Sequence, residues 1–270
     1  MKITVNETEM VLPDGTTLSA VRRKVCPGAD VLVYNGAPVL AVTAAKLSLR
    51  EGDTVALFRR GRKPTAVEAK ALLQARNTPG SVAKLAKVAV GIAGAGGLGS
   101  NAALALARSG IGRLIIADFD VVEPSNLNRQ AYDFRQIGLF KVDALKENIL
   151  RANPYVRVDI RRMRLTAQNA ARAFSGADIL IEALDSADAK AMLAKAFCRS
   201  FPKKPLILAS GLASCNDSNS VRTRKIGPYV YLVGDQRCGV RPGMGLFAPR
   251  VGIAACHQAN LALRLALGLH

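Results

Sequence analysis

Tryptophan is absent from this sequence, and histidine and cysteine are scarce. The 270 residues include two histidines and five cysteines, and no two cysteines stand at zinc-ligand spacing: Cys26, Cys198, Cys215, Cys238 and Cys256. An odd number of cysteines argues for reduced thiols rather than disulfides. We therefore expect neither a structural zinc ion nor a disulfide framework.

Long apolar runs free of polar groups are also missing. The first residues, MKITVNE, have no apolar core of the kind that a signal peptide needs. The apolar final segment, Pro249 to Leu267, contains two arginines, a histidine, a glutamine and an asparagine, which are too many polar groups for a helix in lipid. These absences predict a cytoplasmic protein with no membrane partner.

Acidic residues are few relative to basic ones, with 38 Lys and Arg against 20 Asp and Glu and a formal net charge of +18. Such an excess favours polyanionic or acidic partners. ATP together with an acidic carrier protein would satisfy it as well as nucleic acid would, and a solvated Arg- and Lys-rich surface is an equal alternative. Half of the residues are hydrophobic, so the chain can bury the cores of one large and one small domain.

Glycine is plentiful between residues 87 and 130. An apolar run, Val88 to Ala93, precedes Gly94, Gly96, Gly97 and Gly99, a helical pattern, and a second apolar run that ends in Asp118. Strand, loop, helix and strand in this order predict a nucleotide-binding βαβ unit. Its glycines let the backbone approach a polyphosphate, and the helix start favours negative charge. Asp118, about 20 residues after the glycines, can accept hydrogen bonds from a ribose.

The glycines alone indicate only a nucleotide, because NAD and FAD enzymes share their spacing. Next come DFDVVEPSNLNRQ, the lysine of FKVDALKENILRANP and the aspartate of EALDSADAK. With GAGGLGS, these motifs resemble the ThiF/MoeB/HesA family, bacterial relatives of ubiquitin-activating enzymes that adenylate the C-terminal carboxylate of ubiquitin-like sulfur carriers. The resemblance spans roughly residues 68 to 268. It is closest to the short branch of ThiF-like proteins, since the two zinc-binding Cys-x-x-Cys pairs of many relatives are absent.

The resemblance implies an adenylyltransferase that uses ATP and Mg²⁺ and releases pyrophosphate. A peptide carboxylate, with a pKa of roughly 3.3 to 3.7, is already an anion at pH 7, so the barrier is charge repulsion rather than proton removal. Arginine, lysine and a magnesium ion relieve it. We therefore expect Arg129, Lys141 and Asp185 to be catalytic, with Asp185 as the hard oxygen ligand of Mg²⁺. The expected ATP-binding residues are Gly94, Gly96, Gly97, Gly99, Asp118, Asp120, Asn126, Arg129, Gln130 and Lys141.

Each catalytic candidate has a plainer alternative. Arg129 could pair with a neighbouring aspartate, Lys141 could be a solvated helix residue, and Asp185 could cap the helix that follows it. Some relatives use a loop cysteine in sulfur transfer, and Cys215 and Cys238 lie in predicted loops. Neither stands in a family cysteine motif, so we favour free thiols and assign no catalytic cysteine.

The first sixty residues form a pattern of their own. Residues 2–5, 9–12, 31–34 and 54–58 are predicted strands and 17–25 a helix, which together indicate a β-grasp domain. The phrases VNETEMVLPDGTTLSAV, VLVYNGAPV and LREGDTVALFRRG resemble ThiS, the sulfur carrier of thiamine synthesis. ThiS works through a free Gly-Gly carboxylate, whereas this segment continues as FRRGRKP and has no terminus to adenylate. We expect a ThiS-like domain at 1–60, a linker at 61–66 and a ThiF-like domain at 67–270.

The α/β alternation continues to the end of the chain. The predicted elements after residue 140 are helices at 141–152, 167–174, 187–199 and 249–267, strands at 156–160, 179–183 and 206–209, and an antiparallel hairpin of 221–226 with 229–233. The fold class is therefore α/β. We expect a Rossmann-like, mostly parallel sheet with helices on both faces, preceded by a small α+β, ubiquitin-like β-grasp domain.

The resemblance also implies partners. It points to a ThiS-like carrier, to thiamine (thiazole) biosynthesis, and to thiazole synthase or other thiamine-synthesis proteins; we expect no nucleic-acid partner. In ThiF and MoeB relatives the glycine-rich face is completed across a homodimer. The last helix has an apolar stripe that could be buried in such a dimer: Val251, Ala254, Ala255, Leu261 and Leu265. Arg76 is a candidate to reach a partner subunit's nucleotide site.

Two other functions remain open: a non-catalytic assembly module that recruits thiamine-synthesis partners, and an NAD-dependent Rossmann oxidoreductase. Hydride transfer needs none of SNLNRQ, Lys141 and Asp185, so these motifs separate the oxidoreductase from an adenylyltransferase. Only an activity assay can distinguish the assembly module from an adenylyltransferase. The sequence does not identify the carrier, the sulfur donor or the pathway.

Overall fold

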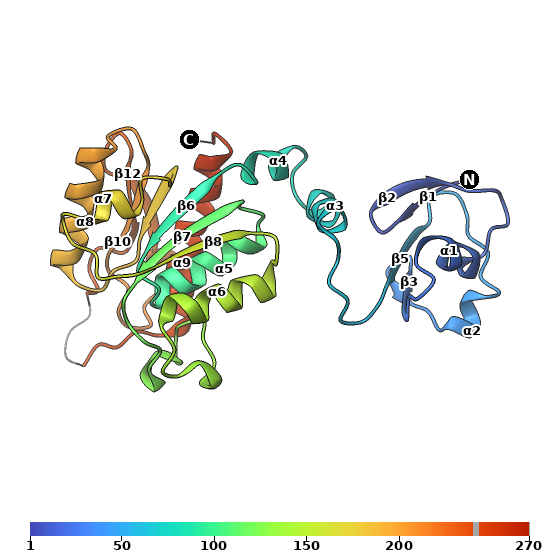
Figure 1. The fold of residues 1–270 in the computed structure, drawn as a ribbon, viewed down its shortest axis with the longest axis horizontal. Helices are drawn as coiled ribbons and strands as arrows, with labels where there is room; N and C mark the ends of the chain where they lie inside the picture. Colours follow the sequence, from blue (N-terminus) through green and yellow to red (C-terminus); the bar gives the residue numbers. More distant parts are fainter. Residues whose placement is uncertain (240–242, 270) are drawn as a thin grey trace. The chain divides into compact units, whose positions relative to one another are not determined.

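The chain folds into two compact units, Met1–Pro79 and Gly80–His270 (Figure 1). This computed structural model describes residues 1–239 and 243–269, except for the side chains of Ala75 and Arg76. The candidate side chain of Arg76 therefore lies outside the described residues. The boundary between the units follows Pro79, so the expected linker at 61–66 falls within the first unit. Within the described part, no helix is long and apolar enough to span a bilayer.

The first unit is built on a five-stranded sheet in the order β2-β1-β5-β3-β4. Strand β1 lies antiparallel to β2 and parallel to β5, and β3 lies antiparallel to both β5 and β4. The elements are β1 (Lys2–Val5), β2 (Thr8–Val11), α1 (Leu18–Val25), β3 (Val31–Tyr34), β4 (Ala37–Pro38), α2 (Ala41–Ala44), β5 (Thr54–Phe58) and α3 (Ala66–Arg76). This arrangement confirms the expected β-grasp domain.

Local sequence explains how this unit closes. Thr17 caps α1 by accepting a hydrogen bond from the Ala20 N–H at 3.3 Å. The turn before β5 is fixed by Asp53, whose buried carboxylate accepts hydrogen bonds from Tyr34 Oη, Asn35 Nδ2 and the Arg50 N–H. Burial opposes the charge on Asp53, yet these hydrogen bonds hold its pKa below the usual range.

The second unit is built on a seven-stranded sheet in the order β11-β12-β10-β9-β6-β7-β8. Every neighbouring pair is parallel except β11 with β12, the expected hairpin, which joins the sheet through β12 and β10. The strands are β6 (Ala89–Ala93), β7 (Arg113–Asp118), β8 (Arg157–Arg162), β9 (Ile179–Glu182), β10 (Leu206–Ala209), β11 (Arg222–Lys225) and β12 (Val230–Gly234). The mostly parallel, Rossmann-like sheet is thereby confirmed.

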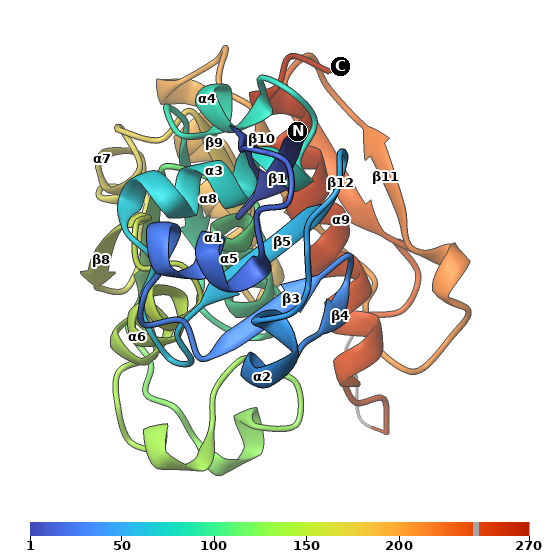
Figure 2. The ribbon, with the colours of Figure 1, turned by 90° about the vertical axis from the view of Figure 1, so that its right-hand side faces the viewer.

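Helices cover both faces of this sheet (Figures 1 and 2). Helices α5 (Gly97–Arg108), α6 (Lys141–Ala152) and α9 (Ala248–Ala266) enclose the larger apolar core, and α7 (Ala170–Ala173) and α8 (Ala187–Ser200) enclose the smaller one. Helix α4 (Ser81–Leu85), which the sequence analysis did not predict, precedes β6. The helix expected at 167–174 is only one turn long, because the Asn169 side chain binds the Thr166 N–H and the Arg164 carbonyl in a turn.

The apolar stripe of α9 is used within the chain. Val251, Ala254, Ala255 and Leu261 belong to the larger core, and Leu265 packs against it. Helix α9 covers α5 and the sheet with this stripe. The stripe therefore gives no support to the expected homodimer.

The order of the strands positions the functional site. From β6 the chain continues to β7 and β8 on one side of the sheet and then returns to β9, β10 and β12 on the other. The reversal lies between β6 and β9, and open α/β sheets bind ligands outside the carboxyl ends of the strands at such a point. The glycine loop follows β6, Asp118 ends β7, and Asp185 follows β9, so three sequence motifs reach one edge of the sheet.

Candidate active site

The glycine loop between β6 and α5 is tightly packed except at one position. Gly94 has a φ of +100°, and a Cβ there would lie 2.5 Å from the Ala183 carbonyl oxygen. A Cβ on Gly99 would overlap the carbonyl oxygen of Gly94. At Gly96, by contrast, a Cβ would meet only Gln130 Nε2, at 3.9 Å. The loop therefore needs glycine for its own packing and leaves open space beside Gly96.

The start of α5 is free to meet an anion. Gly96 is its N-cap residue and supplies no side-chain acceptor. The first N–H groups of a helix have no intrahelical partners, and together with the helix dipole they favour a phosphate. A nucleotide's phosphates would occupy the open space beside Gly96.

Asp118 shapes the glycine loop from the end of β7. Its Oδ2 accepts the Ala95 N–H at 2.6 Å, and its Oδ1 accepts the Asp120 N–H at 2.8 Å. Burial raises the pKa of Asp118, although these hydrogen bonds and the nearby Lys141 oppose that shift. Each oxygen keeps a second lone pair, so the expected ribose contact remains open to Asp118 in addition to this structural role.

Lys141 is buried at the start of α6 and is not the solvated residue of the alternative interpretation. Its Nζ lies 2.9 Å from Asp120 Oδ2, and its backbone N–H donates to the Asp120 carbonyl at 2.9 Å. Tyr132, which the sequence analysis missed, donates its hydroxyl hydrogen to the Ala95 carbonyl at 2.6 Å and lies 3.3 Å from the Lys141 carbonyl. Burial raises the pKa of Tyr132 and keeps its hydroxyl a donor. Tyr132 therefore joins the glycine loop to the start of α6.

The SNLNRQ segment contributes residues with different roles. Buried Asn126 accepts the Glu123 N–H at 3.1 Å and closes a short 3₁₀ turn. Gln130 is also buried, and its Oε1 has no hydrogen-bond partner in the described part of the chain. An orphaned acceptor costs free energy unless a ligand or water completes it. Gln130, next to the open space at Gly96, is therefore suited to a bound nucleotide.

Arg129 pairs with no aspartate of the described residues. Its Nη1 donates to the Ser125 carbonyl at 3.2 Å and to Asn128 Oδ1 at 2.8 Å, both neutral acceptors. Asn101, a second residue missed from the sequence, donates to the Gly97 carbonyl at 2.7 Å and the Arg129 carbonyl at 3.1 Å. The positive charge of Arg129 is therefore held at the start of α5 without a neutralising carboxylate.

Asp185 is exposed in the loop between β9 and α8. Ser186 caps α8 by accepting the Ala189 N–H at 3.2 Å, so Asp185 does not cap this helix. Among the described residues, its carboxylate has no hydrogen bond or ion pair. In that same part of the chain, no three His, Cys, Asp or Glu side chains gather as a metal site. A magnesium ion would therefore combine Asp185 with phosphate and water oxygens, as Mg²⁺ commonly does.

The two loop cysteines lie at the same edge of the sheet, and the environment of Cys238 does not activate its thiol. Asn216 Nδ2 lies 2.9 Å from Cys238 Sγ, and the hydrogen bond of Cys238 to Asp235 raises the pKa of the thiol. Asp235 also receives a hydrogen bond at 2.5 Å from Arg250, which is buried at the start of α9. A protonated thiol is a poor nucleophile, which favours a structural role for Cys238. Cys215 is exposed nearby.

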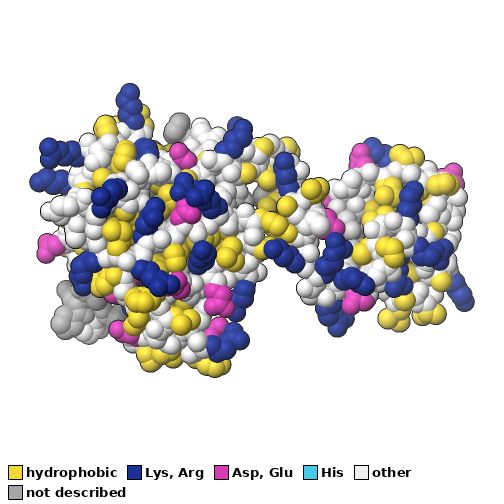
Figure 3. All heavy atoms as spheres, in the orientation of Figure 1, with side chains coloured by type: hydrophobic (Ala, Val, Ile, Leu, Met, Phe, Trp, Pro, Cys, Tyr) yellow, Lys and Arg dark blue, Asp and Glu magenta, His cyan; other side chains and the backbone are white. Residues whose placement is uncertain are grey.

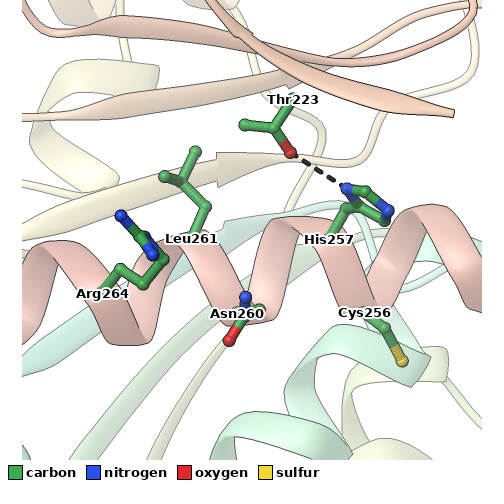
Figure 4. Close-up of a pocket in the computed structure, with 6 residues that line it drawn as sticks. All are labelled: Thr223, Cys256, His257, Asn260, Leu261 and Arg264. Carbon is green, nitrogen blue, oxygen red and sulfur yellow. Dashed lines mark hydrogen bonds between the residues drawn. The ribbon is translucent and has the colours of Figure 1, made fainter. Parts of the chain in front are cut away.

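A separate pocket of about 400 Å³ lies between β11 and α9 (Figure 4). Its lining residues are Thr223, Cys256, His257, Asn260, Leu261 and Arg264. A hydrogen bond of 3.1 Å joins Thr223 Oγ1 and His257 Nδ1 across it. None of the candidate nucleotide-binding residues lines this pocket, so it is distinct from the site at the carboxyl edge of the sheet.

Family comparisons agree with the geometry. Residues 69–270 match the model of the ThiF family, and residues 1–61 match that of ThiS-like ubiquitin. The adenylyltransferase and sulfurtransferase UBA4 of Eremothecium gossypii is 33% identical over 199 residues, which are 69% of this chain and 43% of that protein. The adenylyltransferase and sulfurtransferase MOCS3 of Aedes aegypti is 36% identical over 130 residues, which are 48% of this chain and 29% of that protein. The chain thus spans less than half the length of these relatives.

A solved structure gives fuller coverage. The E. coli tRNA N6-threonylcarbamoyladenosine dehydratase TcdA, in complex with ATP, has a TM-score of 0.65 and 27% sequence identity. The match covers 74% of this chain and 93% of that protein. The same enzyme in complex with AMP matches with the same TM-score and 26% identity, over 73% of this chain. The fold of the second unit is thus that of a protein with known adenine nucleotide complexes.

Proposed function

This chain belongs to the ThiF family, and from that premise we propose that it adenylates the C-terminal carboxylate of a ThiS-like sulfur carrier protein. The observation that carries the proposal is a set of polar groups at the carboxyl edge of the sheet that can bind a ligand. They are the uncapped start of α5, the cations Arg129 and Lys141 and, with no partner among the described residues, the Oε1 of Gln130 and the carboxylate of Asp185. These groups suit a nucleoside triphosphate, and hydride transfer would need neither Lys141 nor Asp185.

In the proposed reaction, an oxygen of the carrier carboxylate attacks the α-phosphorus of ATP. An acyl-adenylate anhydride forms and pyrophosphate leaves. Because the carboxylate is already an anion, no side chain needs to remove a proton. The N–H groups of α5, Arg129 and Lys141 offset the charge on the phosphates as the two anions meet.

Lys141 has to change partner in this scheme. In the structure its ammonium group is neutralised by Asp120 at 2.9 Å. A phosphate oxygen would replace or share that contact, while Asp120 keeps Lys141 oriented before the nucleotide arrives. A magnesium ion held by Asp185 would neutralise further charge on the triphosphate.

We also propose a homodimer and a place in thiamine (thiazole) biosynthesis, with thiazole synthase or another thiamine-synthesis protein as a further partner. The ThiS-like first unit supports the pathway. Exposed apolar side chains beside the site support the homodimer, in place of the stripe on α9. Their exposed fractions range from 42% to 75%, for Phe119, Phe134, Ile137, Leu139 and Phe140. A patch of this kind is typical of a surface that another protein covers.

A second candidate function is adenylation of a carboxylate on tRNA. Of the 38 basic residues, 26 lie in residues 80–270 against 13 acidic ones, and Figure 3 shows Lys and Arg spread over the visible face of that unit. Such a surface favours nucleic acid. TcdA, a tRNA N6-threonylcarbamoyladenosine dehydratase, matches over 73% of this chain.

Exchange of labelled pyrophosphate into ATP tests both candidates. We expect exchange that depends on Mg²⁺ and on a carrier ending in Gly-Gly, and none with a carrier shortened by that dipeptide. Exchange with tRNA alone would establish the second candidate instead. Absence of exchange with every substrate would contradict adenylation and favour a non-catalytic assembly module.

A further inference from the structure

Glu182, the last residue of β9, is a fully buried carboxylate that the sequence analysis did not single out. Lys190 of α8 reaches it from the other side of the loop, with Nζ 2.8 Å from Oε1 and 3.0 Å from Oε2. Burial raises the pKa of Glu182, and the ammonium group of Lys190 opposes that shift. A fully buried carboxylate is costly to desolvate even when a partly exposed lysine pairs with it, and is seldom the most stable choice for a core position. Its geometry therefore calls for an explanation beyond packing.

The carboxylate of Glu182 joins the ends of two strands. Its Oε1 accepts the Leu184 N–H at 2.6 Å, just after β9, and its Oε2 accepts the Ala209 N–H at 3.3 Å, at the end of β10. With Lys190 it therefore ties β9, β10 and α8 together at the carboxyl edge of the sheet. These three elements border the loop that carries Asp185.

The backbone of the same segment is held from two further directions. Gln258 of α9 is buried and donates its Nε2 hydrogen to the Glu182 carbonyl at 2.9 Å. The Ala183 N–H donates to the Ala93 carbonyl at 2.8 Å, beside the glycine loop. The path from Glu182 to Leu184 is thus fixed at every residue, and Asp185 is the next residue along the chain.

Asp185 itself has no side-chain partner in the described part of the chain, so its place is set by the backbone that precedes it. We propose that Glu182 and Lys190 are a positioning pair that holds the Asp185 carboxylate where it can bind the magnesium ion of the nucleotide. This inference rests on the proposed adenylation function. Lys190 and Glu182 touch neither nucleotide nor metal; they act through the Leu184 N–H bond.

The test begins with Lys190→Met, which removes the ammonium group and keeps most of the side-chain length. We expect the Mg²⁺ concentration for half-maximal pyrophosphate exchange to rise by about tenfold, as for other groups that orient metal ligands. The carrier concentration for half-maximal rate should stay unchanged. Lys190→Arg should bring the half-maximal Mg²⁺ concentration most of the way back to the wild-type value, because the guanidinium group can bind the same carboxylate. Lys195→Met is the matched control, since Lys195 is an exposed residue of the same helix.

Two measurements distinguish a positioning role of Glu182 and Lys190 from a role in stability alone. Calorimetry should show that Lys190→Met weakens ATP binding with Mg²⁺ but not in EDTA. The double variant Glu182→Gln, Lys190→Met removes the buried carboxylate together with its ammonium partner. Its melting temperature should recover, while the Mg²⁺ concentration for half-maximal exchange should stay raised. Recovery of both together would overturn positioning in favour of a purely structural pair.

Hydrogen exchange at residues 183–186 gives a result that needs no catalysis. We expect faster exchange of the Leu184 and Asp185 amides in Lys190→Met than in Lys195→Met. Equal exchange in the two variants would overturn the positioning pair. A wild-type protein that exchanges no pyrophosphate would contradict the proposed function alone.

Discussion

The two units each bury a carboxylate at a strand end, and the surroundings of the two groups differ. Asp53 in the first unit accepts hydrogen bonds from neutral donors that hold its pKa low, and those bonds close a turn. Glu182 in the second unit has a pKa raised by burial and is paired with Lys190. It lies beside the loop of Asp185, whose carboxylate has no partner among the described residues. The same type of buried carboxylate closes a turn in the first unit and, in our proposal, positions a metal ligand in the second. A fold of the right class therefore does not by itself bring its chemistry.

The two units also differ in the segments that would take part in adenylation. In the first unit the chain continues past Gly61 as Arg-Lys-Pro, so the ThiS-like fold has no carboxylate to adenylate. In the second, Gly94, Gly97 and Gly99 are packed around an open position. We expect changes in the second unit to alter catalysis and changes in the first to alter folding or recruitment.

The largest expected effect comes from Asp185→Asn. Removing the carboxylate should lower the rate of pyrophosphate exchange by about 10² to 10³, because the metal matters most as charge develops on the phosphates. Carrier binding and the melting temperature should stay unchanged, since the side chain is exposed. Asp188→Asn, which changes an exposed aspartate in the first turn of α8, is the control. Equal rates for the wild type and Asp185→Asn would exclude the magnesium role.

The next effect in size is that of Gly99→Ala. The new Cβ would overlap the Gly94 carbonyl oxygen, and overpacking of this kind destabilises by roughly 1–3 kcal/mol. ATP affinity should fall with it, measured by calorimetry and by thermal unfolding. Gly252→Ala, on α9 where a Cβ meets nothing, should leave stability equal or raise it by about 1 kcal/mol. A Gly99→Ala protein as stable as Gly252→Ala would show that the loop tolerates a side chain.

A smaller effect is expected from deletion of residues 1–64. Each unit has its own apolar core, so the maximal exchange rate should stay within about twofold of the full chain. A lower half-saturating carrier concentration would identify the first unit as an internal competitor, present at a local concentration that a short linker can raise to about millimolar. An unchanged value with loss of thiazole synthase binding would identify a docking element. A large loss of maximal rate would contradict the division of roles.

The smallest effect on catalysis is expected from Asp53→Asn, which should leave exchange unchanged. Its effect should appear in acid unfolding of the isolated first unit, followed by circular dichroism. Because the folded pKa of Asp53 is lowered, its charge stabilises the fold above the unfolded pKa of about 3.9 and loses that effect as the pH falls below it. The variant should therefore be less stable near pH 7 and less sensitive to acid. Glu9→Gln, an exposed residue paired with Lys2, should behave like the wild type. A wild-type-like acid transition in Asp53→Asn would show that this carboxylate does not hold the turn.

Strong local signals in the sequence predicted much of the fold. The helix at 141–152 and the strand at 206–209 were predicted residue for residue. Helical periodicity ends at Asn153-Pro154, and the apolar run of the strand ends at Ser210-Gly211. The helix at 167–174 was too long because Asn169 competes for the backbone. The stripe on α9 was visible, but a sequence does not say whether its own chain or another covers it.

The sequence predicted some residues of the candidate site and not others. Motifs gave the glycine loop and Lys141, whose burial the structure adds. Tyr132 and Lys190 were not predicted, because their roles depend on atoms of other segments. Tyr132 contacts the Ala95 carbonyl, and Lys190 contacts the Glu182 carboxylate. No periodicity records a contact between a side chain and a distant loop. Residues of this type become visible only once the strands are in place.

The contacts of α9 bear on how this protein is made. Val251 lies close to Gly97, and Gln258 donates a hydrogen bond to the carbonyl of Glu182, and α9 is synthesised after both of the segments that it contacts. At about 5–20 residues per second, the ribosome releases the first unit and the glycine loop well before these two side chains exist. The first unit and the glycine loop therefore exist on the nascent chain before the contacts of α9 can form. If the chain adenylates a carrier as proposed, this reaction would have to wait for α9, whereas binding of a partner to the first unit would not.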